Sequence, residues 1–419
     1  MSALPSSVNY ADAPMGLPDD VVSKQIALTP VNGGSFVPGG IIQFDFVNSG
    51  YIVPDSIFLR YKYAFTNLVG AEMTGCPVYS PFSRLEVLMG SNIVESQSQY
   101  SQTCCMNTQL LMDVAAKFGQ QFSYGYNNNT TAAPTLDTAG DGRTLAVSEV
   151  GSFSAPLPCI LSQASKLVPA GFMPQIRLQL TLDALSNYFN ASTVAVPTAL
   201  TLTNVELCYT SITSATFDAA VRSMGPTLSI KSMSYFNSAA VLGTGVNGSV
   251  NLTYNARLAS IRAAFILFTG TTAQSLNKQF DAYDPTSNNG DVSIQIAGVQ
   301  YPQRPLSFLN NKAGILQSTR SAVGSLFNTS NSMSISSVEF AYVGNSTTTI
   351  SAPAKMIIGI PLERIRGGLM SGVSSQNSSI SVVMNTGTAT QQQHNVNLIL
   401  AADQIIVLDL ASGQVAVRQ

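Results

Sequence analysis

Short alternating segments dominate the chain, and each of them predicts a half-buried β-strand. In the stretch GGIIQFDF, the hydrophobic residues Ile42, Phe44 and Phe46 alternate with polar ones. A period of two places successive side chains on opposite faces of a strand, so one face can be buried. Strands of this kind are predicted at residues 41–48, 56–67, 84–90, 176–182, 199–212, 247–254, 260–270, 292–298, 380–386 and 396–410.

A few segments have the spacing of helices instead. The segment from Thr103 to Gly119 places hydrophobic residues four positions apart, from Met106 to Phe118. Thr103 is the predicted N-cap, and Gly119 stands where a glycine ends a helix. Shorter helices are predicted at residues 214–224 and 311–327.

The order of these segments repeats in the second half of the chain. Ser260 lies 204 positions after Ser56 at the start of a predicted strand, and Gly298 lies 208 positions after Gly90 at the end of another. The other predicted strands and the long helix recur with similar offsets and in the same order. An ordered series of this kind indicates that one β-rich module has been used twice.

The repeat predicts the fold class and the domain organisation. About eight short strands per module, with long loops and few helices, favour an all-β protein of two tandem eight-stranded jelly-roll sandwiches with short flanking helices. The Gly225-Pro226 pair is the predicted boundary. We therefore expect an N-terminal arm at 1–20, which contains three prolines and no alternation, a first jelly roll at 21–224 and a second at 225–419.

Composition adds that the surface is unusually poor in charge. Only 10% of the 419 residues are Asp, Glu, Lys or Arg, against roughly 25% in ordinary soluble domains. Such a surface tends to associate, which indicates a subunit of an assembly. The net charge of −2, with no cluster of Lys and Arg, argues against a nucleic-acid-binding protein. We expect no transmembrane helix and no secretory signal, because no long apolar run and no basic start are present.

The chemistry-bearing residues predict no active site. The single histidine, His394, stands in the polar run QQQHNV, which we interpret as a turn without an oriented nucleophile. The GxGxxG match at 243–248 lacks the following helix of a dinucleotide site. The oxygen-rich stretch 284–291 lacks the spacing of a calcium loop and is interpreted as a surface loop. No enzyme activity and no catalytic, cofactor-binding or metal-binding residue is therefore predicted.

The cysteines favour the same conclusion. Their number is odd, they are scattered, and no CxxC occurs, so neither a disulfide framework nor a zinc site is expected. We expect buried free thiols in a reducing compartment. The five residues are Cys76, Cys104, Cys105, Cys159 and Cys208.

Three stretches carry a resemblance to a known family. They are FVPGGIIQFDFVNSGYIVPDSIFLRYKY at 36–63, APLPCILSQASKLVPAGFMPQIRLQLTLD at 155–183 and ADQIIVLDLASGQVAVRQ at 402–419. With them, the chain resembles the double jelly-roll major capsid proteins of tailless icosahedral DNA viruses. Its likeness is greatest to the polinton-like viruses and virophages, within a lineage that includes the tectivirus-like phages.

The resemblance implies a homotrimer whose six jelly rolls give a pseudo-hexagonal capsomer. Such capsomers tile an icosahedral shell, commonly over an internal membrane, with a penton protein at the vertices and minor capsid proteins as further partners. It also implies a location in the virion, after assembly inside the host cell, and no sequence-specific nucleic-acid binding. The duplication and the low charge agree with it, because the centres of subunit interfaces exclude charge.

Two other classes of protein remain open from the residues alone. A secreted or surface-displayed carbohydrate-binding protein or adhesin would be favoured by aromatic-lined loops and a secretion signal. A β-sandwich hydrolase would be favoured by a clustered His, Asp and Glu site.

Overall fold

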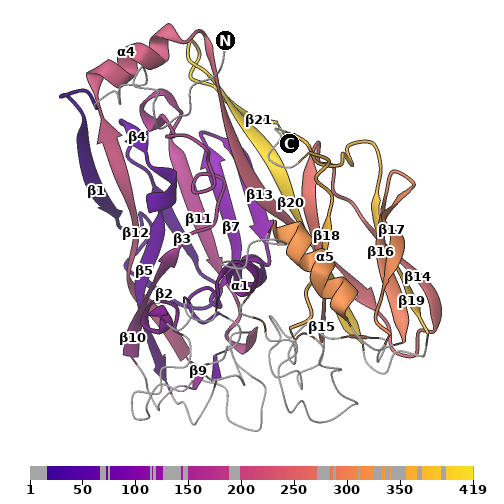
Figure 1. Ribbon diagram of the computed structural model, residues 1–419. Coiled ribbons are helices and arrows are strands. Elements are labelled where there is room, and N and C mark those ends of the chain that lie inside the picture. Colours follow the sequence, from indigo (N-terminus) through magenta and orange to yellow (C-terminus); the bar gives the residue numbers. More distant parts are fainter. Residues whose placement is uncertain are drawn as a thin grey trace, which may run out of the picture.

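The alternating segments pair into antiparallel sheets that bury one face each. In the strand Ile176–Leu182, for example, every second residue is buried, beginning with Ile176. The structure is a computed structural model with two sandwiches side by side (Figure 1). The residues that it describes are 17–66, 72–73, 76–113, 116, 119–125, 143–144, 150–187, 199–270, 284–285, 289–309, 312–324, 333, 335, 340, 355–365, 370–387 and 393–418.

The first sandwich is made of two sheets from the first half of the chain. One sheet has the order β1 (Val22–Leu28), β12 (Ala199–Thr213), β5 (Phe58–Thr66) and β10 (Val150–Pro156), and β2 (Ser35–Phe36) and β4 (Tyr51–Ile52) also pair with β12. The facing sheet has the order β3 (Ile41–Asp45), β11 (Ile176–Leu182), β7 (Phe82–Met89) and β8 (Asn92–Ser98). A separate pair joins β6 (Glu72–Met73) to β9 (Arg143–Thr144).

The second sandwich has the same strand order, position by position. Its first sheet runs β13 (Thr227–Leu242), β20 (His394–Asp409), β15 (Ile261–Gly270) and β18 (Ile358–Pro361), with β21 (Val415–Arg418) added to β20. Its second sheet runs β14 (Gly248–Tyr254), β19 (Ile380–Thr386), β16 (Gly290–Ile296) and β17 (Val299–Ser307). The predicted fold class, two tandem eight-stranded jelly rolls, is confirmed.

The repeat extends to the turns between equivalent strands. Gly90 closes the β7–β8 hairpin with a φ of 63°, and Gly298 closes the β16–β17 hairpin with a φ of 78°. A positive φ is unfavourable for residues with a Cβ and favours glycine, although Ala297, which precedes Gly298 in its turn, also has a positive φ of 53°. Gly90 is the first and Gly298 the second of two turn residues, so the paired strand ends Met89 and Ile296 are 207 positions apart, one fewer than the two glycines.

The helices differ from the prediction most in the first half of the chain. The predicted helix from Thr103 to Gly119 was wrong at its start, since Thr103 lies inside the helix, after the N-cap residue Gln99. It was also wrong to be continuous, because Met112 is extended and ends the helix, whereas Ala116 and Gly119 further on are helical again. Residues 114, 115, 117 and 118 lie outside the described residues. The helices that are described from end to end are α1 (Tyr100–Leu111), α3 (Gln121–Tyr124), α4 (Ala215–Ser223) and α5 (Ala313–Val323), and the 3-10 turns so described are η2 (Pro54–Ser56), η3 (Ala170–Phe172) and η4 (Leu185–Asn187).

The two later helices agree with the sequence. Ser214 caps α4, since its hydroxyl oxygen accepts a hydrogen bond from the Phe217 N–H at 3.1 Å. Gly324 ends α5 in the left-handed conformation, with a φ of 86°. Both ends follow the usual preference for Ser at the N-cap and Gly after the last turn.

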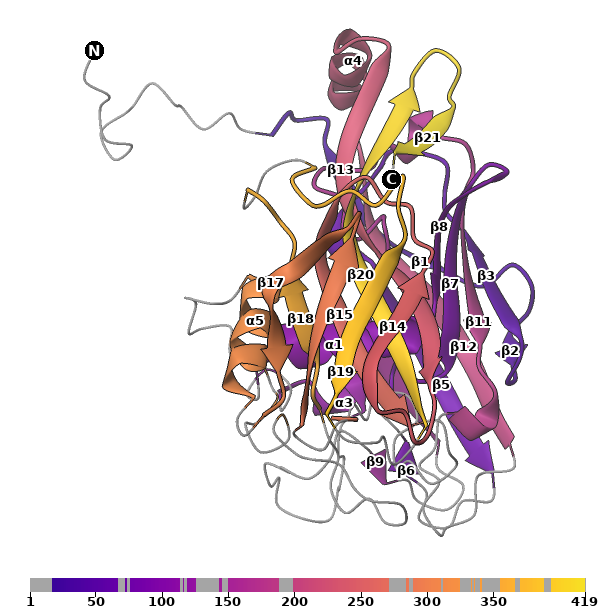
Figure 2. The ribbon, with the colours of Figure 1, turned by 90° about the vertical axis from the view of Figure 1, so that its right-hand side faces the viewer.

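Helix α4 and β21 lie at one end of the molecule (Figures 1 and 2). There the Asp20 carboxylate accepts hydrogen bonds from the Thr216 N–H at 2.9 Å and from the Ser214 hydroxyl at 3.0 Å. Asp20 is thus tied to the first turn of α4. Residues 1–16 lie outside the described residues, so the arm at 1–20 and the two domain ranges stay predictions.

Candidate assembly interface

The two sandwiches meet where the edge strand β8 of the first lies along the edge strand β13 of the second. The Asn237 side-chain amide donates to the Ser98 carbonyl at 2.7 Å and to the Thr103 hydroxyl of α1 at 2.6 Å. The Ser98 hydroxyl donates in return to the Asn237 carbonyl at 3.4 Å. We call this contact of β8 and the first turn of α1 with β13 the seam.

A buried carboxylate stands at the centre of the seam. Glu95 of β8 is 2% exposed and accepts hydrogen bonds from the Ser234 hydroxyl of β13, the Ile160 N–H at 2.7 Å and the Gln97 amide at 2.8 Å. Burial raises the pKa of the Glu95 carboxyl, because desolvation penalises the charged form. The Ser232 hydroxyl of β13 adds a bond to the Ile160 carbonyl at 2.5 Å. Groups from both sandwiches therefore hydrogen-bond to one another away from solvent, although Gln97 Oε1 and Asn237 Oδ1 in the seam have no partner among the described residues.

A second buried carboxylate is balanced by cations beside the seam. Asp403 of β20 is fully buried, and the Ser260 hydroxyl donates to its Oδ2 at 2.9 Å. Its Oδ1 lies 3.8 Å from the Lys231 Nζ and 3.9 Å from the Arg262 Nε. Arg262 also pairs with Glu363 at 3.0 Å. A buried charge needs such partners, so this cluster has a structural explanation.

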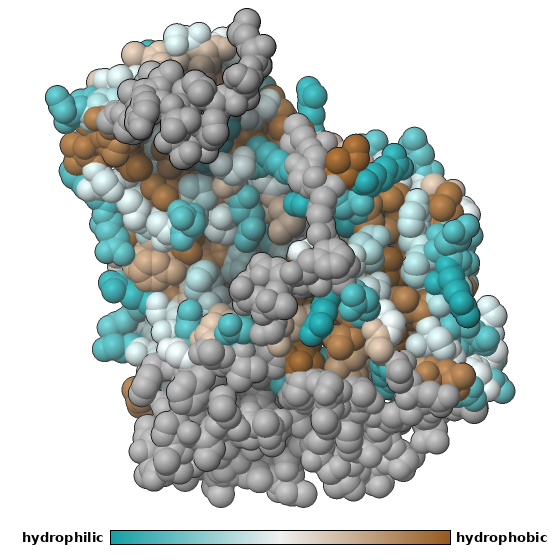
Figure 3. Space-filling view, in the orientation of Figure 1, coloured by the Kyte–Doolittle hydropathy of each residue, from teal (hydrophilic) through white to brown (hydrophobic). Residues whose placement is uncertain are grey.

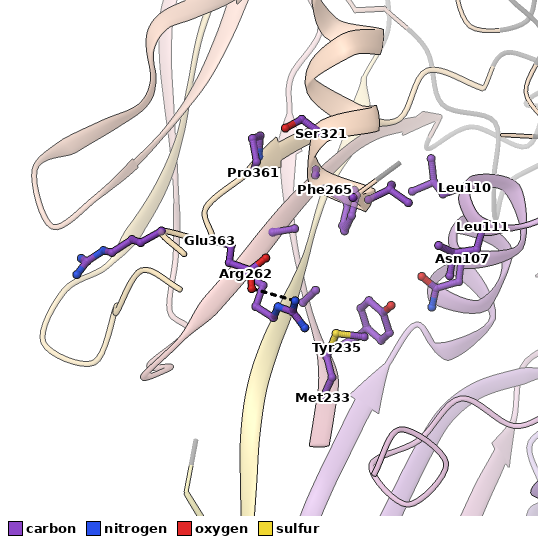
Figure 4. Close-up of a pocket in the computed structure, with 16 residues that line it drawn as sticks. Asn107, Leu110, Leu111, Met233, Tyr235, Arg262, Phe265, Ser321, Pro361 and Glu363 are labelled. Atoms are coloured by element: carbon purple, nitrogen blue, oxygen red, sulfur yellow. Dashed lines mark hydrogen bonds and ion pairs between the residues drawn. The ribbon is translucent and has the colours of Figure 1, made fainter. Parts of the chain in front are cut away.

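A hollow of about 480 Å³ opens between α1 and the second sandwich (Figure 4). Leu110 and Leu111 of α1 lie on one side of it, and Phe265 of β15 lies across from them (Figure 4). Arg262 and Glu363 contribute its polar part. The lining thus combines apolar and charged side chains, as is usual where two packed units meet. It includes no histidine or cysteine.

The structure places His394 differently from the sequence-based interpretation. The predicted polar turn was wrong, because His394 is the first residue of β20 and is only 6% exposed. It lies opposite Leu242 of β13 and Gly270 of β15, so two neighbouring strands extend the sheet to this position. Gln391 and Gln392 lie outside the described residues.

The stretch 284–291 is also more buried than predicted. The interpretation as a surface loop was wrong for Asp284, whose carboxylate is buried and lies 3.0 Å from the Lys312 Nζ. The partner is 28 positions away at the start of α5, which no local pattern indicates. Residues 286–288 lie outside the described residues. By contrast, residues 243–247 join strand β13 to strand β14, which begins at Gly248, as the interpretation of this stretch as a turn requires.

All five cysteines are buried and free, as predicted. The Cys76 N–H donates to the Cys105 sulfur at 3.0 Å. Burial raises the pKa of the Cys104 and Cys105 thiols well above their ordinary range. These thiols are therefore poor nucleophiles at neutral pH.

Two properties hold for the part of the chain that the structure describes. In it, no group of three or more His, Cys, Asp or Glu residues is arranged to hold a metal ion. Across the same residues, no helix has the length and apolar character needed to span a bilayer. The absence of catalytic, cofactor and metal residues stays a prediction for the whole chain.

Comparison by sequence finds no relative. No protein-family model matches the chain, and no curated protein matches it. A search for similar solved structures, however, finds many.

The similar structures come from viral capsids. One is the VP54 protein of PBCV-1, in a crystal structure fitted into a cryo-EM reconstruction of the virophage Sputnik, with a TM-score of 0.62 and 12% identity over 95% of this chain and 97% of that one. The chain has the double jelly-roll fold. The major capsid protein of Faustovirus gives a TM-score of 0.58 and 9% identity over 94% of this chain and 92% of that one. The mavirus major capsid protein gives a TM-score of 0.57 and 10% identity over 100% of this chain and 95% of that one. All three double jelly rolls match nearly end to end.

Proposed function

We propose that this protein is a major capsid protein, a structural component of a virion that is assembled inside the host cell. The observation that carries the proposal is the end-to-end match to capsid proteins, which covers both sandwiches and 95% of the chain in the case of VP54. In this role the chain acts by assembly and performs no chemistry. The buried thiols and the buried, hydrogen-bonded carboxylates agree with such a role.

The assembling unit in this proposal is a homotrimer with a pseudo-hexagonal outline. Two sandwiches with one strand order in each chain supply six from three copies. Capsomers of this kind tile an icosahedral shell, with a penton protein, minor capsid proteins and an internal membrane as further partners. The low charge supports broad contacts between copies, since only 10% of the residues are charged.

We propose the domain organisation on the same basis. β1 to β12 contribute to the first sandwich and β13 to β21 to the second, which supports jelly rolls at 21–224 and 225–419. The arm at 1–20 would reach a neighbouring copy. Deleting residues 2–18 retains Asp20 at α4 and should leave the capsomer folded while shell assembly fails.

Measurement of mass and shape tests the proposal. Light scattering on the purified full chain should give three times the chain mass of 44.2 kDa. Negative-stain microscopy of the same sample should show uniform pseudo-hexagonal particles. A stable monomer at micromolar concentration, with no such particles, would overturn the proposed function.

A further inference from the structure

Both edge strands that form the seam have equivalents at the other side of the molecule. By strand order, β17 of the second sandwich is equivalent to β8, and β1 of the first sandwich is equivalent to β13. The two hairpins differ in register, because the irregularity of β7 and β8 lies between Val87 and Leu88, whereas that of β16 and β17 lies between Val292 and Ile294. Figure 1 places β1 and β17 on opposite sides of the chain.

The equivalent strands differ sharply in how they are covered. Within the seam, β8 and β13 each contain buried polar residues, among them Glu95 and Ser234. No residue of β1 or of β17 is buried. Val22 of β1 is 47% exposed and Val299 of β17 is 53% exposed. On the face shown in Figure 3, hydrophobic atoms reach the surface along the left margin, near the upper end of β1.

An uncovered edge strand is an unstable feature for an isolated molecule. Its outer backbone groups can pair with another strand, although in β17 Pro302 and Pro305 have no N–H to donate, so side chains must make much of such a contact, as they do in the seam. β17, the equivalent of β8, lies on one side of the chain. β1, the equivalent of β13, lies on the other side, and β8 and β13 fit each other in the seam. Two different complementary surfaces on one molecule make a heterologous contact, which either closes a ring or propagates without end.

We propose that β17 of one copy lies along β1 of a second copy, in the arrangement that β8 makes with β13 inside the chain. The inference rests on the proposed capsomer and names the surface that closes it. Each copy offers one β17 and one β1, so every β17 and every β1 of three copies is paired when the ring closes.

The contact between copies differs from the seam in its chemistry. β17 has no Asp or Glu, so the buried carboxylate of the seam is not repeated. The only charged residues of the two strands are Lys24 and Arg304, which are both cationic. Salt screens like charges, so added salt should leave the association unchanged or strengthen it. Dissociation of the capsomer by salt would contradict a contact made by these two strands.

Cross-linking between copies tests the arrangement directly. The variant combines Gln25→Cys on β1 with Gln300→Cys on β17, two exposed positions, and the five native thiols are buried. A bismaleimide should give covalent dimers and trimers of the full chain and nothing larger. The matched control keeps Gln25→Cys and places the second cysteine at Ser249→Cys on β14, the opposite edge of the same sheet. This control should remain uncross-linked.

The outcomes separate this inference from the proposed function. A mass of three chains without cross-linking of the Gln25 and Gln300 variant would overturn the strand pairing and leave the capsid role standing. A monomeric mass would overturn both. Equal cross-linking in the control, or a ladder that continues beyond three chains, would contradict the specific closed contact.

Discussion

The two sandwiches share a strand order but are filled with different side chains. In the first, Tyr61 packs edge-on against Phe82 and Phe153, with ring centroids 5.7 Å apart in each pair. In the second, Phe268 packs edge-on against Phe308 with ring centroids 6.5 Å apart, and most other buried side chains of the described residues are aliphatic. The order of strands therefore depends on alternation and turns, which many sets of hydrophobic residues satisfy.

The largest expected effect comes from truncating a buried ring in either core. Phe82→Ala in the first sandwich and Phe268→Ala in the second should each cost about 3–5 kcal/mol, because both side chains are fully buried and leave a cavity. The two cores belong to one continuous hydrophobic cluster. We therefore expect urea denaturation to give a single transition that both variants shift. Two transitions, with only one shifted by each variant, would mean that the sandwiches unfold independently.

The next effect concerns the seam that joins the sandwiches. Glu95→Ala removes the acceptor of three hydrogen bonds and leaves the Ser234 hydroxyl and the Ile160 N–H buried without it. Each such group costs about 1–3 kcal/mol, so the free energy of unfolding should fall by roughly 3 kcal/mol or more. Urea denaturation measures it, and Glu95→Gln is the control of matched size. A loss below about 1 kcal/mol would mean that the donors find other acceptors.

The same residue predicts a pH dependence. Burial raises the pKa of Glu95 in the folded state above its ordinary value of 4.5. The unfolded chain therefore loses this proton at lower pH than the folded chain does, and stability should fall as pH rises from 4.5 through the raised pKa. Glu95→Gln should remove this part of the decline. An identical pH profile for the two proteins would contradict the role of the carboxyl.

Exposed edges of the two sandwiches should respond unequally to a new charge. Val299→Glu on β17 places an unpaired carboxylate in the proposed contact between copies and should weaken the trimer at least roughly tenfold, about 1.4 kcal/mol. Ile41→Glu on β3, which is 48% exposed, lies on an edge for which the seam offers no equivalent. It should leave the trimer intact. Equal weakening by both variants, measured by analytical ultracentrifugation, would refute the distinction between these edges.

Local pattern was sufficient for most strands and insufficient for buried polar residues. The strands at 176–182 and 380–386 were predicted with their observed bounds, because alternation is a property of neighbouring residues. His394 and Asp284 were misplaced, since their burial depends on strands and a lysine that are distant in sequence. Glu95 gave no signal at all, because its segment NIVESQS has the pattern of an exposed edge. Sequence thus predicted the repeated fold, whereas the seam emerged only from the structure.

The smallest expected effect compares a capped helix with an uncapped one. Ser214→Ala removes the side-chain cap of α4 and should lower the free energy of unfolding by about 1 kcal/mol. Gln99 makes no side-chain cap at α1, so Gln99→Ala loses no such bond.

Asp20 supports the same turn of α4, and its hydrogen bond from the Thr216 N–H holds the pKa of its carboxyl below 3.8. A lowered folded pKa stabilises the protein above the ordinary value, and this contribution is lost as pH falls through the lowered one. Asp20→Asn should therefore lower stability at neutral pH, where the contribution is fully present, and flatten the stability profile below pH 3.8. Thermal denaturation as a function of pH checks both changes, and an undiminished acid-dependent loss in Asp20→Asn would show that other carboxylates account for it.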